Sequence, residues 1–331
     1  MKRPFAMLTS TAHAVPNRVF TNHDFASIGI ETSDEWIRER TGIGQRYIAG
    51  EGENLTSLCT EAAREAMAAA GVTAAELDAI ILGTASPDRL LPSTAVEVQA
   101  ALGATRAVAF DIDAACSGWL YGTQIAEGLI ATGSYETILV IGGEVLSRIV
   151  NWKDRNTCVL FGDGAGATVV KKATKGRGIL SAYMRSDGTL ADLLHRPKGA
   201  GNAPVTPEII LEGSHYIQMA GREVFKNAVR SMADAADRAL DGAKLSASDI
   251  DVLIPHQANI RIIEATAKHA GIPMEKVFVN VEKYGNTSAA SIPIALSEAQ
   301  KAGVVKEGTT VMFVAFGAGF TLILGAAYTL W

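Results

Sequence analysis

Short apolar runs alternate along the chain with longer, alanine-rich amphipathic segments. Runs such as 77–83, 106–113 and 137–141 have the length and composition of buried strands, whereas 55–70 and 117–131 are typical of helices. This alternation predicts βαβ units and therefore an α/β fold. Further expected elements are a first strand within 1–14, a short helix at 32–41, a helix entered at 90–94, a strand at 168–171, a loop at 196–207 and a helix at 216–240.

The second half of the chain repeats the first at a constant offset of 173 positions. Four consecutive elements recur without a gap, because AAREAM, TAAELD, AIIL and TILV align with AADRAL, SASDID, VLIP and TVMF. One offset shared by four elements indicates a duplicated α/β unit. We therefore expect two halves, residues 1–173 and 174–331, whose corresponding strand ends face one shared cleft.

Composition and charge narrow the class of protein. The chain has 331 residues, 48% of them hydrophobic and 20% charged, with a net charge of −5 that argues against a general nucleic-acid binder. No stretch approaches the roughly 18 apolar residues that span a membrane, and 1–14 is too broken by polar residues for a signal peptide. Three cysteines without a CxxC pair indicate neither a disulfide framework nor a metal site. We expect a soluble cytoplasmic protein.

The candidate nucleophile is Cys116, which follows the apolar run 107–112 in a turn of small residues. A strand, a tight turn and a helix would place its side chain where the free backbone N–H groups of the helix favour a thiolate. The alternative is a buried structural cysteine, since free cysteine is among the most buried residue types.

His256 and Asn286 follow other apolar segments in the same way. Taken singly, a histidine here is more often a structural residue, and an asparagine after glycine is more often part of a turn. Together with Cys116 they would supply a nucleophile, an acid, base or oxyanion donor, and a second neutral donor at the mouth of a duplicated unit.

The second half also carries a row of basic residues, Arg222, Lys226 and Arg230, at helical spacing. Such a row is usually a solvated helix face, and the alternative is a docking site for an acidic partner. The glycine-rich segment 162–167 matches neither a dinucleotide fingerprint nor a phosphate-binding loop in spacing, so we interpret its glycines as backbone-packing positions.

Several long motifs give the chain a specific resemblance. They are TSDEW at 32–36, AACSG at 114–118, FGDGAGA at 161–167, MAGREVFK at 219–226, PHQANIR at 255–261, GNTSAAS at 285–291 and FGAGF at 316–320. In this order they resemble the thiolase-fold condensing enzymes, and closely the β-ketoacyl-acyl carrier protein synthase III family, which initiates type II fatty acid synthesis. The resemblance runs nearly end to end and implies two duplicated halves packed as a layered αβαβα structure.

The resemblance also implies a reaction and a site. The family carries out a decarboxylative Claisen condensation of an acyl-CoA primer with malonyl-acyl carrier protein through an acyl-cysteine. Its catalytic triad corresponds to Cys116, His256 and Asn286, and the oxyanion hole to the backbone N–H groups of Cys116 and Ala318. Ala318 stands where glycine is common in the family, and this substitution leaves the backbone donor in place. No permanently bound cofactor and no metal are implied, because coenzyme A enters as a thioester substrate.

Binding residues follow from the same resemblance. The coenzyme A site would comprise Thr32, Trp36, Arg40, Arg155, Gly221, Phe225 and Asn259. The carrier-docking surface would comprise Arg222, Lys226, Arg230 and Arg261. The family is homodimeric, and a residue from the partner closes the acyl pocket; here Leu91 stands where many members have phenylalanine. We expect this smaller side chain to allow primers that are branched or longer than acetyl.

Three other functions remain open from the sequence. A condensing enzyme of the same fold in a specialised pathway, such as polyketide priming or quinolone formation, would share the motifs. A Cys-His-Asn thioester hydrolase would share the three residue types without needing the repeat. A non-catalytic carrier-binding protein would need no reactive cysteine.

Overall fold

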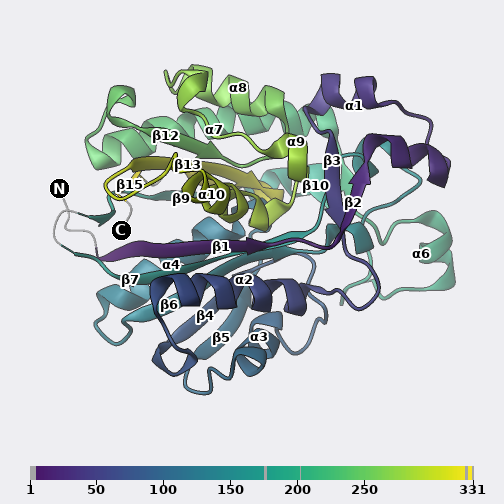
Figure 1. Ribbon diagram of the computed structural model, residues 1–331. Helices are drawn as coiled ribbons and strands as arrows, with labels where there is room; N and C mark the ends of the chain where they lie inside the picture. The colour runs from purple at the N-terminus through teal and green to yellow at the C-terminus, as the bar shows by residue number, and fades with distance from the viewer. Residues whose placement is uncertain (1–4, 175–176, 202, 325–326, 330–331) are drawn as a thin grey trace.

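The computed structural model describes residues 5–174, 177–201, 203–324 and 327–329 (Figure 1). Its helices are α1 Asp34–Thr41, α2 Leu55–Ala70, α3 Thr94–Leu102, α4 Gly118–Ala131, α5 Arg155–Cys158, α6 Pro207–Glu212, α7 Gly221–Ala243, α8 Ile260–His269, α9 Val281–Tyr284 and α10 Ser291–Lys301. Two single-turn 3-10 helices, η3 Ala115–Ser117 and η8 Ser288–Ala290, stand directly before α4 and α10.

Most strands belong to two mixed sheets. The first has the order β1-β7-β6-β4-β5, with β4 parallel to β5 and β6; the second has the order β8-β15-β13-β14-β9, and β12 pairs in parallel with β13. Two small two-stranded sheets pair β2 with β3 and β10 with β11. The strands are β1 Ala6–Ala14, β2 Arg18–Thr21, β3 Gln45–Ile48, β4 Ala79–Gly83, β5 Val108–Ile112, β6 Thr137–Glu144, β7 Gly164–Lys172, β8 Gly178–Ile179, β9 Tyr183–Arg185, β10 Leu194–His195, β11 Gln218–Met219, β12 Val252–Pro255, β13 Thr310–Gly317, β14 Thr321–Leu324 and β15 Ala327–Thr329.

Helices and sheets alternate in five layers. Helices α2 and α3 cover the outer face of the first sheet, α4 and α10 fill the space between the sheets, and α7 and α8 cover the second sheet (Figure 1). The central layer is apolar towards both sheets, since α4 and α10 share one buried hydrophobic cluster with β4, β6, β12 and β13. Within it, Trp119 of α4 packs edge-on against Phe313 of β13 at a ring distance of 5.4 Å. The layered αβαβα arrangement is the one expected from the sequence.

The repeat is visible in the backbone. At the offset of 173, η3 corresponds to η8, the start of α4 to the start of α10, and β6 to β13, each residue for residue. Even the backbone strain repeats, since Ala115 has φ +44° and the corresponding Ser288 has φ +47°. The halves share the central apolar layer, and we propose that they divide at residue 173.

Most expected elements are confirmed, but some boundaries are wrong. The strand expected at 168–171 is β7, which already begins at Gly164 within the glycine-rich segment. The helix expected at 55–70 is α2 with the same bounds, whereas the helix expected from 216 begins only at Gly221. The intervening chain is extended: the N–H of Ile217 donates to the carbonyl of Ile149, and β11 pairs with β10. Tertiary pairing therefore outweighs the helical pattern in this segment.

Candidate active site

Cys116 lies in η3, where β5 has ended and α4 begins. Two glycines allow this turn to approach the neighbouring strand, because a Cβ on Gly83 would lie 2.5 Å from the carbonyl carbon of Gly118. The side chain of Cys116 is only 8% exposed. The strand–turn–helix placement predicted for this cysteine is therefore confirmed.

The protonation state of Cys116 differs from the expected thiolate. Burial raises the pKa of the thiol to about 12, and a hydrogen bond from the Ser288 side chain lowers it by less. The nearby Glu144 carboxylate adds to the upward shift. The helix start is present, but desolvation opposes the charge, so the thiol keeps its proton at neutral pH.

His256 follows β12 and is buried, with 1% of its surface exposed. Its Nδ1 lies 2.7 Å from Oγ of Ser291, and that oxygen also accepts the N–H of Gln257 at 3.5 Å. The Ser291 hydroxyl can donate to Nδ1, and in that tautomer the ring proton lies on Nε2. Nε2 has no hydrogen-bond partner among the described residues, and burial lowers the pKa of His256 to about 3. The ring is therefore neutral, and in this tautomer its Nε2 is a hydrogen-bond donor.

Asn286 is held by its backbone on both sides. Its N–H donates to the carbonyl of Leu160 at 2.9 Å, and its carbonyl accepts the N–H of Gly162 at 3.0 Å. Gly162 is required at this crossing, because a Cβ there would lie 2.4 Å from the carbonyl oxygen of Tyr284. The side-chain Oδ1 accepts the N–H of Ser288 at 2.9 Å, which leaves the amide NH₂ as the group available to a ligand.

The segment 286–291 connects the three predicted residues. Asn286 begins the segment, the Ser288 side chain lies near enough to Cys116 to lower the pKa of its thiol, and Ser291 forms a hydrogen bond with His256. The 3-10 helix η8 within this segment packs against η3, the turn that carries Cys116. The structure therefore links a thiol and two neutral donors around one turn.

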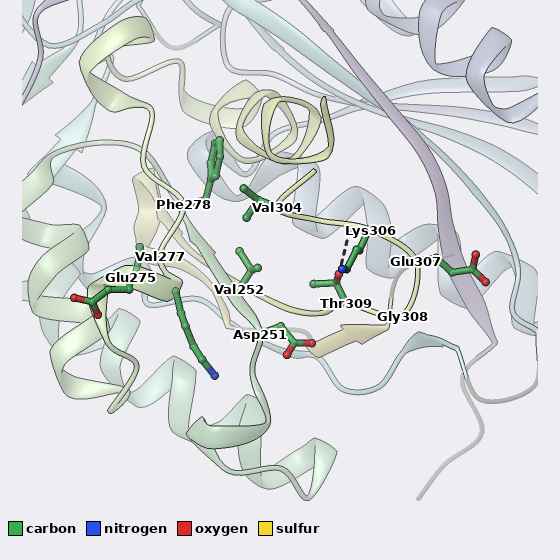
Figure 2. Close-up of a pocket in the computed structure, with 11 residues that line it drawn as sticks. Asp251, Val252, Glu275, Val277, Phe278, Val304, Lys306, Glu307, Gly308 and Thr309 are labelled. Carbon is green, nitrogen blue, oxygen red and sulfur yellow. Dashed lines mark hydrogen bonds between the residues drawn. The ribbon is translucent and has the colours of Figure 1, made fainter. Parts of the chain in front are cut away.

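A cavity of about 500 Å³ opens beside Cys116. Its wall combines residues of the first half with the segment around β10 and with residues that follow β13. The lining residues are Ala85, Asp113, Ala114, Ala115, Cys116, Leu146, Ile149, Phe161, Ala191, Leu194, His195, Arg196, Ile217, Ser288, Ala318 and Gly319. Its largely apolar wall fits an acyl chain. A different hollow of about 520 Å³ lies beyond Asp251, at the opposite end of β12 from His256 (Figure 2).

The predicted coenzyme site is partly assembled around Trp36 on α1. The guanidinium carbon of Arg155 lies 4.6 Å from the Trp36 ring centre, and that of Arg40 lies 4.9 Å from it. Oγ1 of Thr32 is buried and has no hydrogen-bond partner among the described residues. An indole face flanked by two planar cations therefore lies on α1, and a free hydroxyl lies just before the start of this helix.

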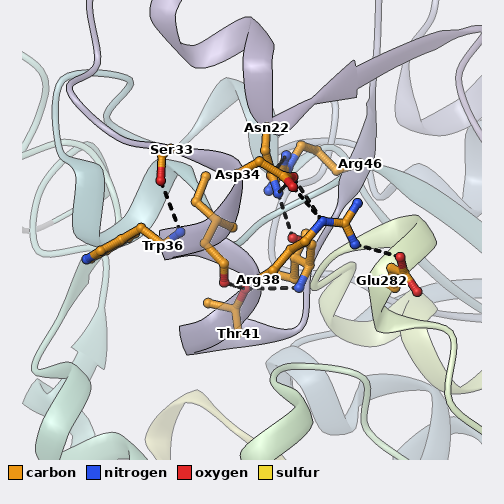
Figure 3. Close-up of polar contacts among 10 residues, drawn as sticks. Asn22, Ser33, Asp34, Trp36, Arg38, Thr41, Arg46 and Glu282 are labelled. Atoms are coloured by element: carbon orange, nitrogen blue, oxygen red, sulfur yellow. Dashed lines mark hydrogen bonds and ion pairs between the residues drawn. The ribbon is translucent and has the colours of Figure 1, made fainter.

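Helix α1 is fixed by a network of polar contacts (Figure 3). The Ser33 hydroxyl caps the helix by accepting the N–H of Trp36, and Arg38 bonds to both Asp34 and Glu282 at 2.8 and 2.6 Å. Asn259 adds a further link, since its Nδ2 donates to the carbonyl of Arg40 at 2.9 Å. The platform that carries Trp36 is thus tied to the second half of the chain.

The other predicted binding residues lie on the surface. Gly221, Phe225 and the basic row Arg222, Lys226 and Arg230 are exposed on the first part of α7. Arg261, on the neighbouring α8, is exposed and donates to the carbonyl of Glu39 at 2.7 Å. Leu91 is 87% exposed and is absent from the described lining of the cavity.

Comparison with known proteins identifies the family. The chain is 52% identical to the β-ketoacyl-[acyl-carrier-protein] synthase III of Symbiobacterium thermophilum, over 98% of this chain and 97% of the relative. The chain belongs to the β-ketoacyl-[acyl-carrier-protein] synthase III family. Models of that family, 3-oxoacyl-[acyl-carrier-protein] synthase III and its C-terminal part, match residues 110–188 and 240–329. The protein is thus an acyltransferase of the condensing-enzyme type.

Solved structures of the family share the fold. The 3-oxoacyl-[acyl-carrier-protein] synthase III of Aquifex aeolicus superposes with a TM-score of 0.90 at 47% identity, over 98% of this chain and 99% of that one. A priming β-ketosynthase of the R1128 polyketide pathway gives a TM-score of 0.91 at 32% identity, over 99% and 97%. The predicted thiolase-like α/β fold is confirmed.

Sequence reasoning missed Ser288 and Glu144. Ser288 corresponds to Ala115 at the repeat offset, so the repeat itself marks it as a neighbour of the cysteine turn. Glu144 is the last residue of the apolar strand β6. His256, which directly follows β12, became a candidate because of a similar position at a strand end. Both signals were available in the sequence, but neither residue has a motif of its own.

Proposed function

We propose that this protein condenses an acyl-CoA primer with malonyl-acyl carrier protein, releases carbon dioxide and forms the β-ketoacyl-acyl carrier protein that starts fatty acid synthesis. Family membership supports the reaction. The observation that carries the residue assignment is the segment 286–291, which connects Asn286 and His256 with the turn of Cys116. Cys116 and Ser288 of this arrangement line an apolar cavity.

In the first half-reaction, the sulfur of Cys116 attacks the thioester carbonyl of the primer. The oxyanion that forms accepts backbone N–H groups of Cys116 and Ala318, and coenzyme A leaves as the thiol. Sulfur suits this exchange because it is both a soft nucleophile and a good leaving group. The acyl chain would occupy the cavity lined by Leu146, Phe161 and Ile217.

In the second half-reaction, the malonyl group loses carbon dioxide and becomes an enolate. Its oxygen accepts the Nε2 proton of His256 and an amide proton of Asn286, two neutral donors that lose little on desolvation. The enolate carbon then attacks the acyl group on Cys116, and the cysteine is released.

Coenzyme A would bind with its adenine at Trp36. A ring stacked between Trp36 and Arg155 needs roughly 7 Å between them, so the guanidinium now 4.6 Å from the ring centre has to move aside. Thr32 and Arg40 would complete the adenine end. Gly221, Phe225 and Asn259 would line the pantetheine arm.

The acidic carrier protein would dock on α7 and α8. Arg222, Lys226, Arg230 and Arg261 form a positive patch there on a chain whose net charge is −5. A local patch of this kind attracts an acidic partner despite the overall charge.

We further propose a cytoplasmic homodimer that needs no resident cofactor or metal. In the dimer, Leu91 of each protomer would reach the acyl pocket of its partner, which accounts for an apolar side chain that is 87% exposed in one chain. In the part of the chain that the structure describes, no helix has both the length and the apolar character to cross a bilayer.

Mass spectrometry of the intact protein after exposure to a series of acyl-CoAs tests the proposal. We expect one acyl group, on Cys116, that persists until malonyl-acyl carrier protein is added. Rapid release of the free acid would indicate a hydrolase instead, and an unreactive Cys116 would indicate a non-catalytic carrier-binding protein.

A second candidate is a priming condensing enzyme of a specialised pathway, which the 32% identity to the R1128 priming β-ketosynthase supports. The two functions can be separated by measuring condensation rates with different acceptors. The rate with the malonyl-acyl carrier protein of fatty acid synthesis is compared with the rates with other carrier proteins and acceptors. A strong preference for another acceptor would favour the second.

A further inference from the structure

Glu144, at the carboxyl end of β6, is fully buried beside the candidate site, and the mechanism above does not use it. Its carboxyl accepts hydrogen bonds from the Ser86 hydroxyl, from the Thr84 hydroxyl at 3.2 Å and from the N–H of Ala85 at 3.1 Å. It forms no ion pair with a lysine, arginine or histidine of the described residues. A buried carboxyl held only by neutral donors is poised to take up a proton.

Ser288 connects this carboxyl to the nucleophile. The Ser288 side chain is near enough to both groups to lower the pKa of Glu144 and that of Cys116, and η8, to which it belongs, packs against both β6 and η3. Its own N–H is fixed by Oδ1 of Asn286 at 2.9 Å. Ser288 also has a φ of +47°, an uncommon conformation for a residue other than glycine that is often retained at functional sites.

Among the described residues, the ionisable groups whose pKa values are coupled to that of Glu144 are acids. Asp113, before η3, raises its pKa, and Glu144 in turn raises the pKa values of Cys116 on η3 and Cys59 on α2. Burial is the largest effect and raises the pKa of Glu144 to about 7. Since neighbouring negative charges oppose one another, a proton on either Glu144 or Cys116 favours ionisation of the other.

His256 is less suited to accept the proton of Cys116. Its Nδ1 is paired with Ser291, and burial lowers the pKa of the ring to about 3, so it is a weak base at neutral pH. The thiol itself is held protonated by burial. Acylation of Cys116 therefore needs another acceptor within reach.

We propose that Glu144 is a positioning residue that accepts the proton of Cys116 through the hydroxyl of Ser288. As the bond between sulfur and the acyl carbon forms, the thiol proton passes to Oγ of Ser288, and Ser288 gives its own hydroxyl proton to Glu144. When the bond to coenzyme A breaks, the same path runs backwards and protonates the departing sulfur. Glu144 is then a carboxylate again, so no other reactant is consumed. The inference rests on Cys116 as the proposed nucleophile.

The test is the pH dependence of Cys116 acylation in a single turnover with acetyl-CoA, read by intact mass between pH 5.5 and 9. The wild-type rate should rise with pH through about 7, as Glu144 becomes a carboxylate, and then level off. In Glu144→Gln and in Ser288→Ala we expect the rate to fall by about 100-fold and the rise near pH 7 to disappear.

Ser86→Ala is the matched control. It removes one donor to the same carboxyl but leaves the path through Ser288 intact. Because the lost hydrogen bond stabilises the carboxylate, the rise in rate should remain and move to higher pH. A purely structural role for Glu144 would lower the rate without removing or shifting the rise.

The proposal is overturned if folded Glu144→Gln keeps the wild-type pH profile. Circular dichroism and thermal unfolding report whether the variant is folded, and if it is not, Ser288→Ala decides by the same criterion. If wild-type Cys116 takes up no acetyl group at all, the nucleophile assignment fails instead, so the two failures are distinguishable.

Discussion

Asn286 has two side-chain groups with different tasks. Its Oδ1 accepts the N–H of Ser288 and so helps to hold η8, while its NH₂ is the group left for the enolate. The backbone hydrogen bonds to Leu160 and Gly162 do not depend on the side chain. Substitutions at this position can therefore separate structure from chemistry.

We predict that Asn286→Ala lowers the condensation rate by about 100- to 1,000-fold, since one oxyanion donor is lost. Acylation of Cys116 should persist in this variant. Asn286→Asp keeps the acceptor for Ser288 but removes the donor, so it should be as defective in condensation. The rate of β-ketoacyl product formation and the intact mass measure the two steps; an active Asn286→Asp enzyme would contradict the donor role.

His256 couples stability to pH. The buried ring has a pKa of about 3, whereas an unfolded histidine has one of about 6.5, so the unfolded state binds more protons between these values. This contribution to stability is complete above pH 6.5 and is lost as the pH falls towards 3. As the pH is lowered from 6 to 4, the free energy of unfolding should decrease in both proteins. We expect the decrease per pH unit to be about 1.4 kcal/mol smaller in His256→Gln than in wild type. Urea unfolding at several pH values measures both slopes; equal slopes would contradict the buried neutral ring.

At the scale of elements, α1 and α7 carry the two proposed substrate surfaces. Helix α1 is short, and its position depends on contacts to distant segments, such as the ion pair of Arg38 with Glu282 (Figure 3). Helix α7 is long and packs against the core through its buried alanine-rich face. Its exposed basic side chains can therefore be substituted without disturbing the core packing.

Substitution of Trp36 tests the coenzyme platform. Trp36→Ala should raise KM for acyl-CoA about tenfold, because stacking on an aromatic face contributes on the order of 1 to 2 kcal/mol, while kcat at saturation changes little. Arg18→Ala is a suitable control, since Arg18 lies over Phe20 instead, with its guanidinium carbon 5.3 Å from the ring centre. An unchanged KM for acyl-CoA in Trp36→Ala would show that α1 is not part of the coenzyme-binding site.

Charge reversal on α7 tests the carrier surface. Arg222→Glu and Lys226→Glu should raise KM for malonyl-acyl carrier protein about tenfold or more at low salt, and added salt should narrow the difference from wild type. Arg238→Glu makes the same charge change farther along α7, where Arg238 pairs with Asp234, and should have little effect. Equal effects of all three substitutions would indicate that the overall charge of the protein, rather than a local docking surface, attracts the carrier protein.

At the scale of the whole molecule, the two proposed halves contribute different residues to the proposed site. Cys116 and Glu144 come from the first half, and His256, Asn286 and Ser288 from the second. The first sheet ends in the edge strand β5, and Leu90 and Leu91 are 80% and 87% exposed in the chain between β4 and α3. An apolar pair this exposed is typical of a surface that another chain covers.

The prediction at this scale concerns the acyl pocket, which Leu91 is proposed to enlarge. Wild-type enzyme should be charged by branched or longer acyl-CoAs at rates similar to acetyl-CoA, and Leu91→Phe should slow the longer primers more than acetyl. Sedimentation should show a dimer for both proteins. A wild-type rate that falls sharply beyond acetyl-CoA would show that Leu91 does not enlarge the acyl pocket.

Local patterns in the sequence determined the elements, the repeat and the three candidate residues, because periodicity, capping residues and strand ends are properties of neighbouring positions. The tertiary structure decided what depends on segments far apart in the chain. It delayed the start of α7 to Gly221 by pairing β11 with β10, and it buried Cys116 deeply enough to oppose a thiolate. It also brought Ser288 and Glu144 to that thiol, since burial and contact arise only when β6, η3 and η8 pack together.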